Sequence, residues 1–163
     1  MPNNKRWGVL YCPKHELLSP KRRWEKIEKC LKDNGVEYDF IQSESSSGVD
    51  RLIKMMINNG YETIVIVGGD SALNDAVNCL MQYDSSVRER VVLGVIPNGL
   101  MNDFAHFWGF RESDYSQTIK WLKQRHVRKI DLGCIRYTNK KGETCSRYFL
   151  NCIHICLISA LMI

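Results

Sequence analysis

The segment Ile64-Val65-Ile66-Val67-Gly68-Gly69-Asp70-Ser71 decides how the rest of the chain is interpreted. Its four β-branched apolar residues predict a strand that is buried on both faces, as in a parallel sheet. The two glycines end this strand, and Leu73, Val77 and Leu80 then recur on one face of a helix. A strand, a glycine turn and a helix N-terminus form a geometry that binds phosphate, because glycine lets backbone N–H groups approach an anion.

Asp70 is the unexpected residue of this turn. A carboxylate does not help to bind bare phosphate, so Asp70 indicates a bridging Mg²⁺ or a proton to be accepted. The structural alternative is a tight turn in which Asp70 or Ser71 caps the following helix. The segment alone does not separate these interpretations, and a second loop later in the chain is needed to decide between them.

Composition places the chain among ordinary globular proteins. It has 163 residues, 44% of them hydrophobic, and a net charge of +5, which fits an anionic ligand without requiring one. No basic run has the length or the interleaved aromatic residues of a nucleic-acid binder, so no nucleic-acid partner is expected. The seven cysteines form no Cys-x-x-Cys pair, and no signal-peptide pattern precedes the first predicted strand. We therefore expect reduced thiols and a cytoplasmic location.

Strands and helices are predicted to alternate over most of the chain. Strands are expected at residues 7–11, 38–41, 64–67 and 91–96, and the last two are continuous apolar runs expected to be buried. Helices are expected from Pro20 to Gly35 and after Gly69. Another helix is expected to end near Gly60, with Leu52, Met55 and Met56 facing inward. Two more are expected to start at Phe104 and at Tyr115. This alternation predicts an α/β fold with a three-layer, doubly wound and mostly parallel sheet.

The last part of the chain departs from this alternation. Strands are expected at residues 128–132, 133–137 and 147–151, with a hairpin turn at 139–142. We therefore expect a nucleotide-binding α/β domain over residues 1–130 and the start of a truncated, β-rich second domain over 131–163. The chain ends within apolar sequence, which favours a fragment of a longer protein over a short protein whose last segment packs back on the sheet.

Four loops are expected at the carboxyl ends of the predicted parallel strands. They are residues 12–16, 43–48, 68–72 and 97–103, and three of them are dense in Gly, Pro, Asn, Asp or Ser. Ligands of open parallel sheets bind at this edge. The chain has no Gly-x-x-x-x-Gly-Lys-Ser/Thr and no Gly-x-Gly-x-x-Gly after the first strand, which disfavours Walker-type NTPases and ordinary dinucleotide folds.

Two of these loops carry a resemblance to a known family. The first is strand–Gly68-Gly69-Asp70–helix with Asn74 and Asn78, and the second is strand–Pro97-x-Gly99-x-x-Asn102-Asp103-Phe104-Ala105. Together they resemble the catalytic domain of diacylglycerol kinases, a superfamily that also holds sphingosine kinases and, more distantly, NAD kinases. Leu10-Tyr11-Cys12-Pro13, Ile130-Asp131-Leu132-Gly133 and Tyr148-Phe149-Leu150-Asn151 extend the resemblance to nearly the whole chain.

The resemblance implies ATP and Mg²⁺ as cofactors and a lipid as the acceptor of the phosphoryl group. Asp70 would be the catalytic and metal-binding residue near the γ-phosphate, and Asn102 and Asp103 would brace the loop. The membrane surface is an implied peripheral partner, and oligomerisation is left open. The residues implied in nucleotide binding are Cys12, Pro13, Lys14, Ser43, Gly68, Gly69, Asp70, Ser71, Asn74, Gly99, Asn102 and Asp103.

The chain also departs from the family pattern. Ser71-Ala72 and Gly99-Leu100 stand where the family has Gly-Thr, and Cys12-Pro13 stands for its Asn-Pro. Two threonine hydroxyls are therefore missing, each worth about 0.5–1.5 kcal/mol as a hydrogen bond. A lipid kinase whose isolated fragment is inactive is the leading hypothesis. The alternatives are a non-catalytic nucleotide- or lipid-binding protein of the same fold, and a soluble-substrate kinase such as an NAD kinase.

Two further features have competing interpretations. Asp103 either shares the Mg²⁺ environment of Asp70 or caps the helix that starts at Phe104. The aromatic residues Phe104, Phe107, Trp108 and Phe110 either pack in the core, which we favour, or form a lipid-facing patch. None of the four histidines has metal-ligand spacing to Cys or Asp.

Overall fold

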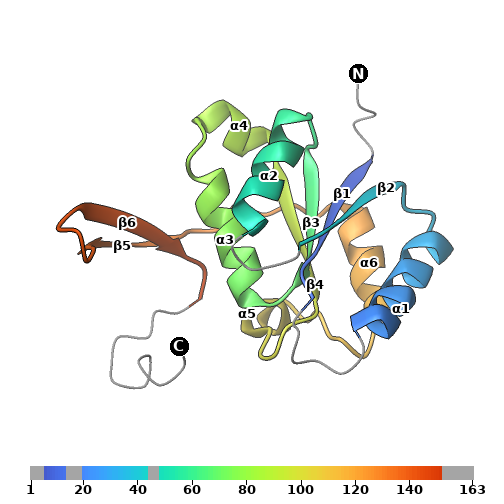
Figure 1. Cartoon of the computed structure of the whole chain (residues 1–163). Coiled ribbons are helices and arrows are strands. Elements are labelled where there is room, and N and C mark those ends of the chain that lie inside the picture. Colours follow the sequence, from blue (N-terminus) through green and yellow to red (C-terminus); the bar gives the residue numbers. More distant parts are fainter. Residues whose placement is uncertain (1–5, 14–19, 44–47, 152–163) are drawn as a thin grey trace.

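The computed structural model describes residues 6–13, 20–43 and 48–151. Strands and helices alternate through the first four strands, and a hairpin follows the last helix (Figure 1). The elements are β1 (Trp7–Tyr11), α1 (Pro20–Asp33), β2 (Tyr38–Gln42), α2 (Val49–Asn58), β3 (Thr63–Gly68), α3 (Asp70–Leu80), α4 (Ser85–Arg90), β4 (Val92–Pro97), α5 (Asp103–Phe107), α6 (Tyr115–Gln124), β5 (Gly133–Thr138) and β6 (Thr144–Phe149).

The four strands β1 to β4 form one parallel sheet in the order β2-β1-β3-β4. Val9 of β1 is in register with Phe40 on one side and with Val65 on the other, and Val65 is in register with Gly94 of β4. The predicted α/β fold with a parallel sheet is confirmed. From β1 the chain adds β2 on one side of the sheet and β3 and β4 on the other side. The switch point between β1 and β3 is where ligands of such sheets bind.

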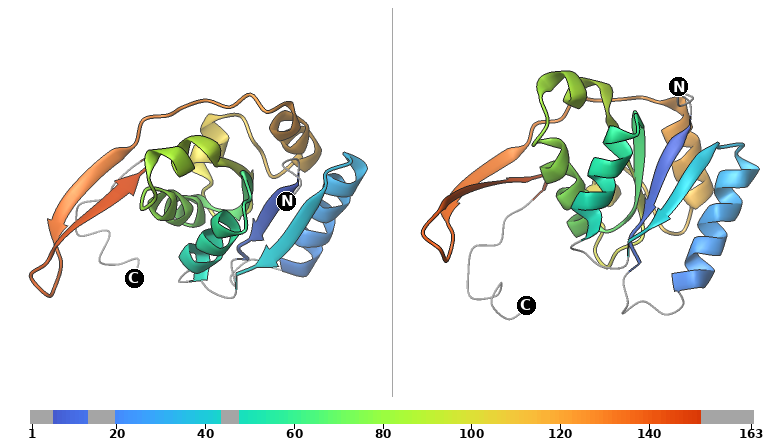
Figure 2. Two further views of the ribbon diagram at one scale, coloured as in Figure 1. Left: turned by 90° about the horizontal axis from the view of Figure 1, so that it is seen from above. Right: turned by 45° about the horizontal axis from the view of Figure 1, so that its top comes forward.

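Helices cover both faces of the sheet, so the fold has the three predicted layers (Figures 1 and 2). Successive side chains of a strand point to opposite faces. Ile64 and Ile66 of β3 therefore pack with α2 and α3, while Val65 and Val67 pack with α1 and α6. This double burial explains why β3 is a continuous apolar run rather than an alternating one.

Two local predictions were wrong, and one short helix was missed. Met55 is 39% exposed, because the buried stripe of α2 consists of Val49, Ile53, Met56 and Ile57, and Met55 lies off this helical face. The helix α4 was not predicted; it is short, and the side chain of Asp84 caps it by accepting from the Val87 N–H at 3.0 Å. Residues 128–132 are not a strand, and ladder pairing begins only at Gly133.

The strands β5 and β6 form an antiparallel hairpin that extends from the α3 side of the molecule (Figure 1). Its turn at residues 139–142 was predicted, and Gly142 has the positive φ of +81° that this turn needs. The side chain of Asn78 on α3 binds the Tyr148 backbone twice, donating to the carbonyl and accepting from the N–H, both at 2.9 Å. These bonds fix the hairpin to α3. The strand β6 starts at Thr144, three residues before its predicted start.

No helix in the described ranges is both long and apolar enough to cross a bilayer.

Candidate functional site

The segments that follow the four parallel strands lie next to one another in the order of the sheet. The Ser43 N–H donates to the Tyr11 carbonyl at 2.8 Å, and the Cys12 N–H donates to the Val67 carbonyl at 2.9 Å. The Asn98 N–H donates to the Gly68 carbonyl at 3.0 Å. Of the residues that the resemblance implied, those on or directly beyond this carboxyl edge are Cys12, Pro13, Ser43, Gly68 and Gly69. Asp70, Ser71 and Asn74 lie on α3, and Gly99, Asn102 and Asp103 lie between β4 and the first residue of α5. Lys14 lies outside the described residues.

The two glycine-containing loops touch at Gly69 and Gly99. A Cβ added to Gly99 would lie 2.3 Å from the Cα of Gly69, and one added to Gly69 would lie 2.9 Å from the Cα of Gly99. Neither glycine has a positive φ. Both positions therefore need glycine because two backbones approach closely, and not because the turns are left-handed.

Asp70 joins the two loops through its carboxylate. Oδ2 accepts from the Asp103 N–H at 2.8 Å, and Oδ1 accepts from the Phe104 N–H at 3.1 Å. Asp70 is the first residue of α3, yet it caps the N-terminus of α5. Neither cap expected from the sequence is present. The N-cap residue of α3 makes no side-chain bond to that helix. Asp103 contributes a backbone N–H, which donates to Asp70, and not a capping acceptor for α5. Each oxygen of Asp70 keeps lone pairs that can hold a cation.

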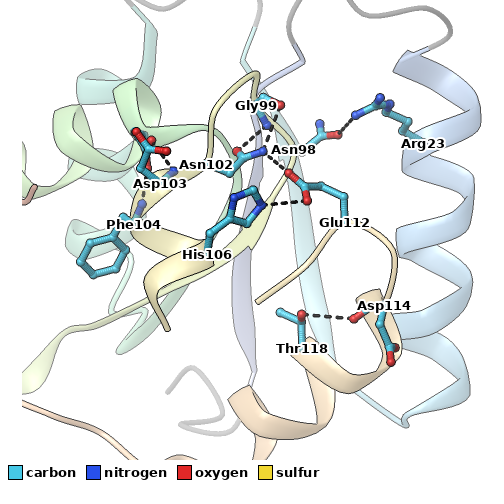
Figure 3. A network of polar contacts seen from close by, with 11 residues as sticks. Arg23, Asn98, Gly99, Asn102, Asp103, Phe104, His106, Glu112, Asp114 and Thr118 are labelled. Carbon is cyan, nitrogen blue, oxygen red and sulfur yellow. Dashed lines mark hydrogen bonds and ion pairs between the residues drawn. The ribbon is translucent and has the colours of Figure 1, made fainter. Parts of the chain in front are cut away.

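Asn102 fixes the second loop from within. It is 2% exposed and has a left-handed φ of 54°. Its Oδ1 accepts from the Gly99 N–H at 2.7 Å, and its Nδ2 donates to the Gly99 carbonyl at 3.0 Å (Figure 3). Because the Gly99 N–H is engaged inside its own loop, Gly99 contributes close packing to this site rather than a free donor.

Glu112 holds Asn102 in place from the segment between α5 and α6. One carboxylate oxygen accepts from Asn102 Nδ2, and the other lies 3.0 Å from His106 Nε2 (Figure 3). Burial raises the pKa of Glu112, but hydrogen bonds from His106, from its own backbone N–H and from Asn102 outweigh burial, and the net pKa is lowered. The sequence analysis missed Glu112, since nothing in its residue type or spacing singles it out.

The start of α3 lies at this junction. Gly69 is the N-cap residue and provides no side-chain acceptor, so no N-cap side chain bonds the first N–H groups of α3 within the described residues. One turn later, Oδ1 of Asn74 is buried and has no hydrogen-bond partner among the described residues. Free backbone donors and an unpaired amide oxygen are what a nucleotide phosphate and a nucleotide donor group need. The start of α3 is therefore of the kind that holds a nucleotide phosphate.

The comparisons with known proteins agree with this geometry. A family described as "Diacylglycerol kinase catalytic domain" matches residues 6–135. The chain belongs to the diacylglycerol kinase catalytic domain family. It is 25% identical over 147 residues to a protein of Staphylococcus carnosus named diacylglycerol kinase, with 90% of this chain and 44% of the relative covered. A diacylglycerol kinase of Bacillus subtilis matches at 25% identity over the same share of both chains.

Solved structures of this family share the fold. A crystal structure described as a diacylglycerol kinase from Bacillus anthracis str. Sterne superposes with a TM-score of 0.69 at 19% identity, covering 90% of this chain and 46% of that chain. The chain spans about half the length of the curated relatives it matches.

The structure shows the surroundings of three positions that differ from the kinase family pattern. Ser71 is the second residue of α3, is exposed and has no positive φ, so the missing family glycine leaves no backbone strain. Leu100 is 66% exposed and offers no hydroxyl where the family has threonine. Burial and the nearby Asp75 carboxylate raise the pKa of Cys12 to about 12, so Cys12 is a neutral thiol beside Gly68.

Proposed function

We propose that this chain is the nucleotide-binding half of an ATP-dependent lipid kinase, which transfers the γ-phosphoryl group of ATP to a lipid hydroxyl. The observation that carries the proposal is the carboxylate of Asp70 bonded to the backbone of the second loop, at the place where Gly69 and Gly99 touch. Catalysis of phosphoryl transfer depends mainly on positioned hydrogen-bond donors and on charge neutralisation, and less on covalent catalysis by the protein.

Each part of the site has a defined task in this proposal. The uncapped N–H groups at the start of α3 would bind phosphate oxygens. The close contact of Gly69 and Gly99 would hold the two loops beside each other, so that both can face the triphosphate. When bound, Mg²⁺ supplies the charge neutralisation between the triphosphate and Asp70, whose oxygens keep free lone pairs.

The proposal is tested by titrating the chain with ATP in the presence of Mg²⁺, in calorimetry, for wild type and Asp70→Asn. We expect Asp70→Asn to weaken binding about ten-fold or more. Asp84→Asn is the matched control, because Asp84 also caps a short helix, but that helix is α4 and does not start at either glycine loop. Equal affinities in wild type and Asp70→Asn would contradict the role of Asp70.

A transfer assay separates the lipid kinase from its two alternatives. The longest natural product of the gene that contains this chain is incubated with radiolabelled ATP, mixed lipids and, separately, NAD. Label in a lipid supports the lipid kinase, and label in NAD supports the soluble-substrate kinase. Tight ATP binding without any transfer supports the non-catalytic protein, for which the loss of two family threonines at Ala72 and Leu100 is the motivation.

A further inference from the structure

The short helix α5 is held by two carboxylates that come from different parts of the chain. A helix of five residues is not stable by itself, so its position depends on its contacts. The Asp70 carboxylate binds two backbone N–H groups at the helix start. The Glu112 carboxylate binds the side chains of Asn102 and His106 (Figure 3). The His106 N–H also donates to the Asn102 carbonyl at 2.9 Å, so Glu112 binds both ends of this first helical turn.

Glu112 determines which way the amide of Asn102 points. Its pKa is lowered, so at neutral pH it is a carboxylate, which only accepts hydrogen bonds and selects the Nδ2 end of the amide. The Oδ1 end then faces Gly99 and accepts from its N–H at 2.7 Å. The opposite orientation would place two acceptors together at Glu112 and two donors together at Gly99. Asn102 is 2% exposed, so water does not relieve such a mismatch.

The Asn102 side chain in turn supports an unusual backbone conformation. Its φ of 54° lies in the left-handed region, which residues with a Cβ seldom adopt, although asparagine tolerates it better than most. Asp103 and Phe104 follow directly, and within the described ranges their N–H groups are the hydrogen-bond partners of the Asp70 carboxylate. A rotation of the Asn102 backbone therefore displaces the two donors that orient Asp70.

We propose that Glu112 is a positioning residue of the nucleotide site, which acts on Asp70 through Asn102 and the first turn of α5. Loss of the Glu112 carboxylate frees the Asn102 amide, and the left-handed backbone loses its support. The oxygens of Asp70 then have no fixed donors. The effect of Glu112 on ATP rests on the proposed function, whereas its effect on the donors of Asp70 can be measured without a nucleotide.

The first measurement is hydrogen exchange of the Asp103 and Phe104 amides in the nucleotide-free chain, detected by NMR. Glu112→Ala should accelerate both about five-fold, because one hydrogen bond to the turn is lost. Glu112→Gln should recover most of the protection, since its amide oxygen still accepts from Asn102. Glu89→Ala is the matched control and should leave both rates unchanged, because Glu89 is an exposed glutamate of α4.

The second measurement is a double-mutant cycle on ATP affinity in Mg²⁺, by calorimetry. Glu112→Ala alone should weaken ATP binding about five-fold, and Glu112→Gln should recover most of this loss. In the Asp70→Asn background, Glu112→Ala should cause little further loss, because its effect passes through Asp70. A residue that merely supports the fold would lower the affinity by the same factor in both backgrounds.

Three results would overturn the inference. They are equal amide exchange in wild type and Glu112→Ala, equal losses of affinity in the two backgrounds, and no recovery in Glu112→Gln. A wild-type chain that binds no ATP contradicts the proposed function instead, and amide exchange then decides alone whether Glu112 positions Asp70. Urea unfolding confirms that each variant is folded. Should alanine unfold the chain, Glu112→Asp replaces it with the same expectations, because its carboxylate is one methylene too short to bind both ends of the turn.

Discussion

The backbones of Gly69 and Gly99 meet so closely that neither residue has room for a side chain. This contact joins the turn after β3 to the turn after β4 and fixes the distance between Asp70 and the start of α5. A methyl group at either position has to push the two loops apart, because the atoms it meets belong to the backbone and cannot rotate away.

Gly99→Ala is therefore expected to destabilise the chain by about 1–3 kcal/mol and to reduce ATP binding. Chemical unfolding in urea measures the first effect and calorimetry the second. Gly94→Ala in the middle of β4 is the control, since its new methyl group would meet the flexible end of Leu122 at 3.2 Å. If both variants lose the same stability, the contact between Gly69 and Gly99 has no special role.

Asp70→Ala should cost more stability than Asp70→Asn. Alanine removes both acceptors from the start of α5, which costs about 0.5–2 kcal/mol for a helix cap, whereas asparagine retains one acceptor oxygen. Both variants lose the charge and should bind ATP weakly. Comparing the two by urea unfolding and by ATP titration separates the capping role of Asp70 from its electrostatic role. A variant that binds ATP weakly only when the fold is also weakened would assign Asp70 a purely structural role.

The stability contribution of Glu112 should depend on pH with a definite sign. Its pKa is lowered in the folded chain, because hydrogen bonds from His106, its own N–H and Asn102 outweigh the effect of burial. A lowered pKa stabilises the fold above the unfolded pKa, near 4.3, and this stabilisation is lost as pH falls through the folded pKa. Unfolding in urea should therefore show Glu112→Gln less stable than wild type at neutral pH, with a smaller difference in acid. A difference that grows in acid would contradict this assignment.

Asn78→Ala should loosen the hairpin without unfolding the sheet. The Asn78 side chain makes two hydrogen bonds to the Tyr148 backbone, and Arg147 beside it pairs with Asp75 at 2.7 Å. Hydrogen exchange of the Tyr148 amide should accelerate by about ten-fold, while exchange in β3 stays unchanged. Asn58→Ala is the control, because Asn58 lies on α2 and its side chain accepts a long hydrogen bond of 3.5 Å from the Tyr83 hydroxyl. Faster exchange in β3 would mean that Asn78 supports the whole fold.

Cys12 should alkylate more slowly than Cys134. Burial and the Asp75 carboxylate raise the pKa of Cys12 to about 12, so almost none of it is the reactive thiolate near neutral pH. Cys134 on β5 is exposed. Iodoacetamide labelling followed by peptide mass spectrometry gives both rates in one sample. Labelling of Cys12 as fast as Cys134 would show that the thiol is neither buried nor neutral.

The sheet could be predicted from the sequence because its signals are local. The run from Ile64 to Val67 needs burial on both faces, and Pro20 and Gly35 bracket the helix α1, which ends at Asp33. The adjacency of the two glycine loops could also be predicted from the sequence, because the carboxyl ends of parallel strands lie at one edge of the sheet. These predictions depend only on periodicity and on residues that start or stop an element.

The partners of the site residues could not be predicted in the same way. Asp70 bonds to backbone groups 33 and 34 residues further on, and any residue type supplies a backbone N–H. Glu112 reaches Asn102 from an irregular segment whose path has no sequence signal. The residue type of Phe107 predicts a place in the core. Phe107 is instead exposed, at the end of the short helix α5.

Two helices begin at the carboxylate of Asp70, one by sequence and one by capping. The negative charges of Asp70 and of Asp103, the first residue of α5, offset the positive ends of these dipoles. The two carboxylates therefore reduce the attraction of the helix starts for bare ATP. A triphosphate bound here has to bring its own counter-charge, and the metal complex of the nucleotide is expected to bind far more tightly than the metal-free anion.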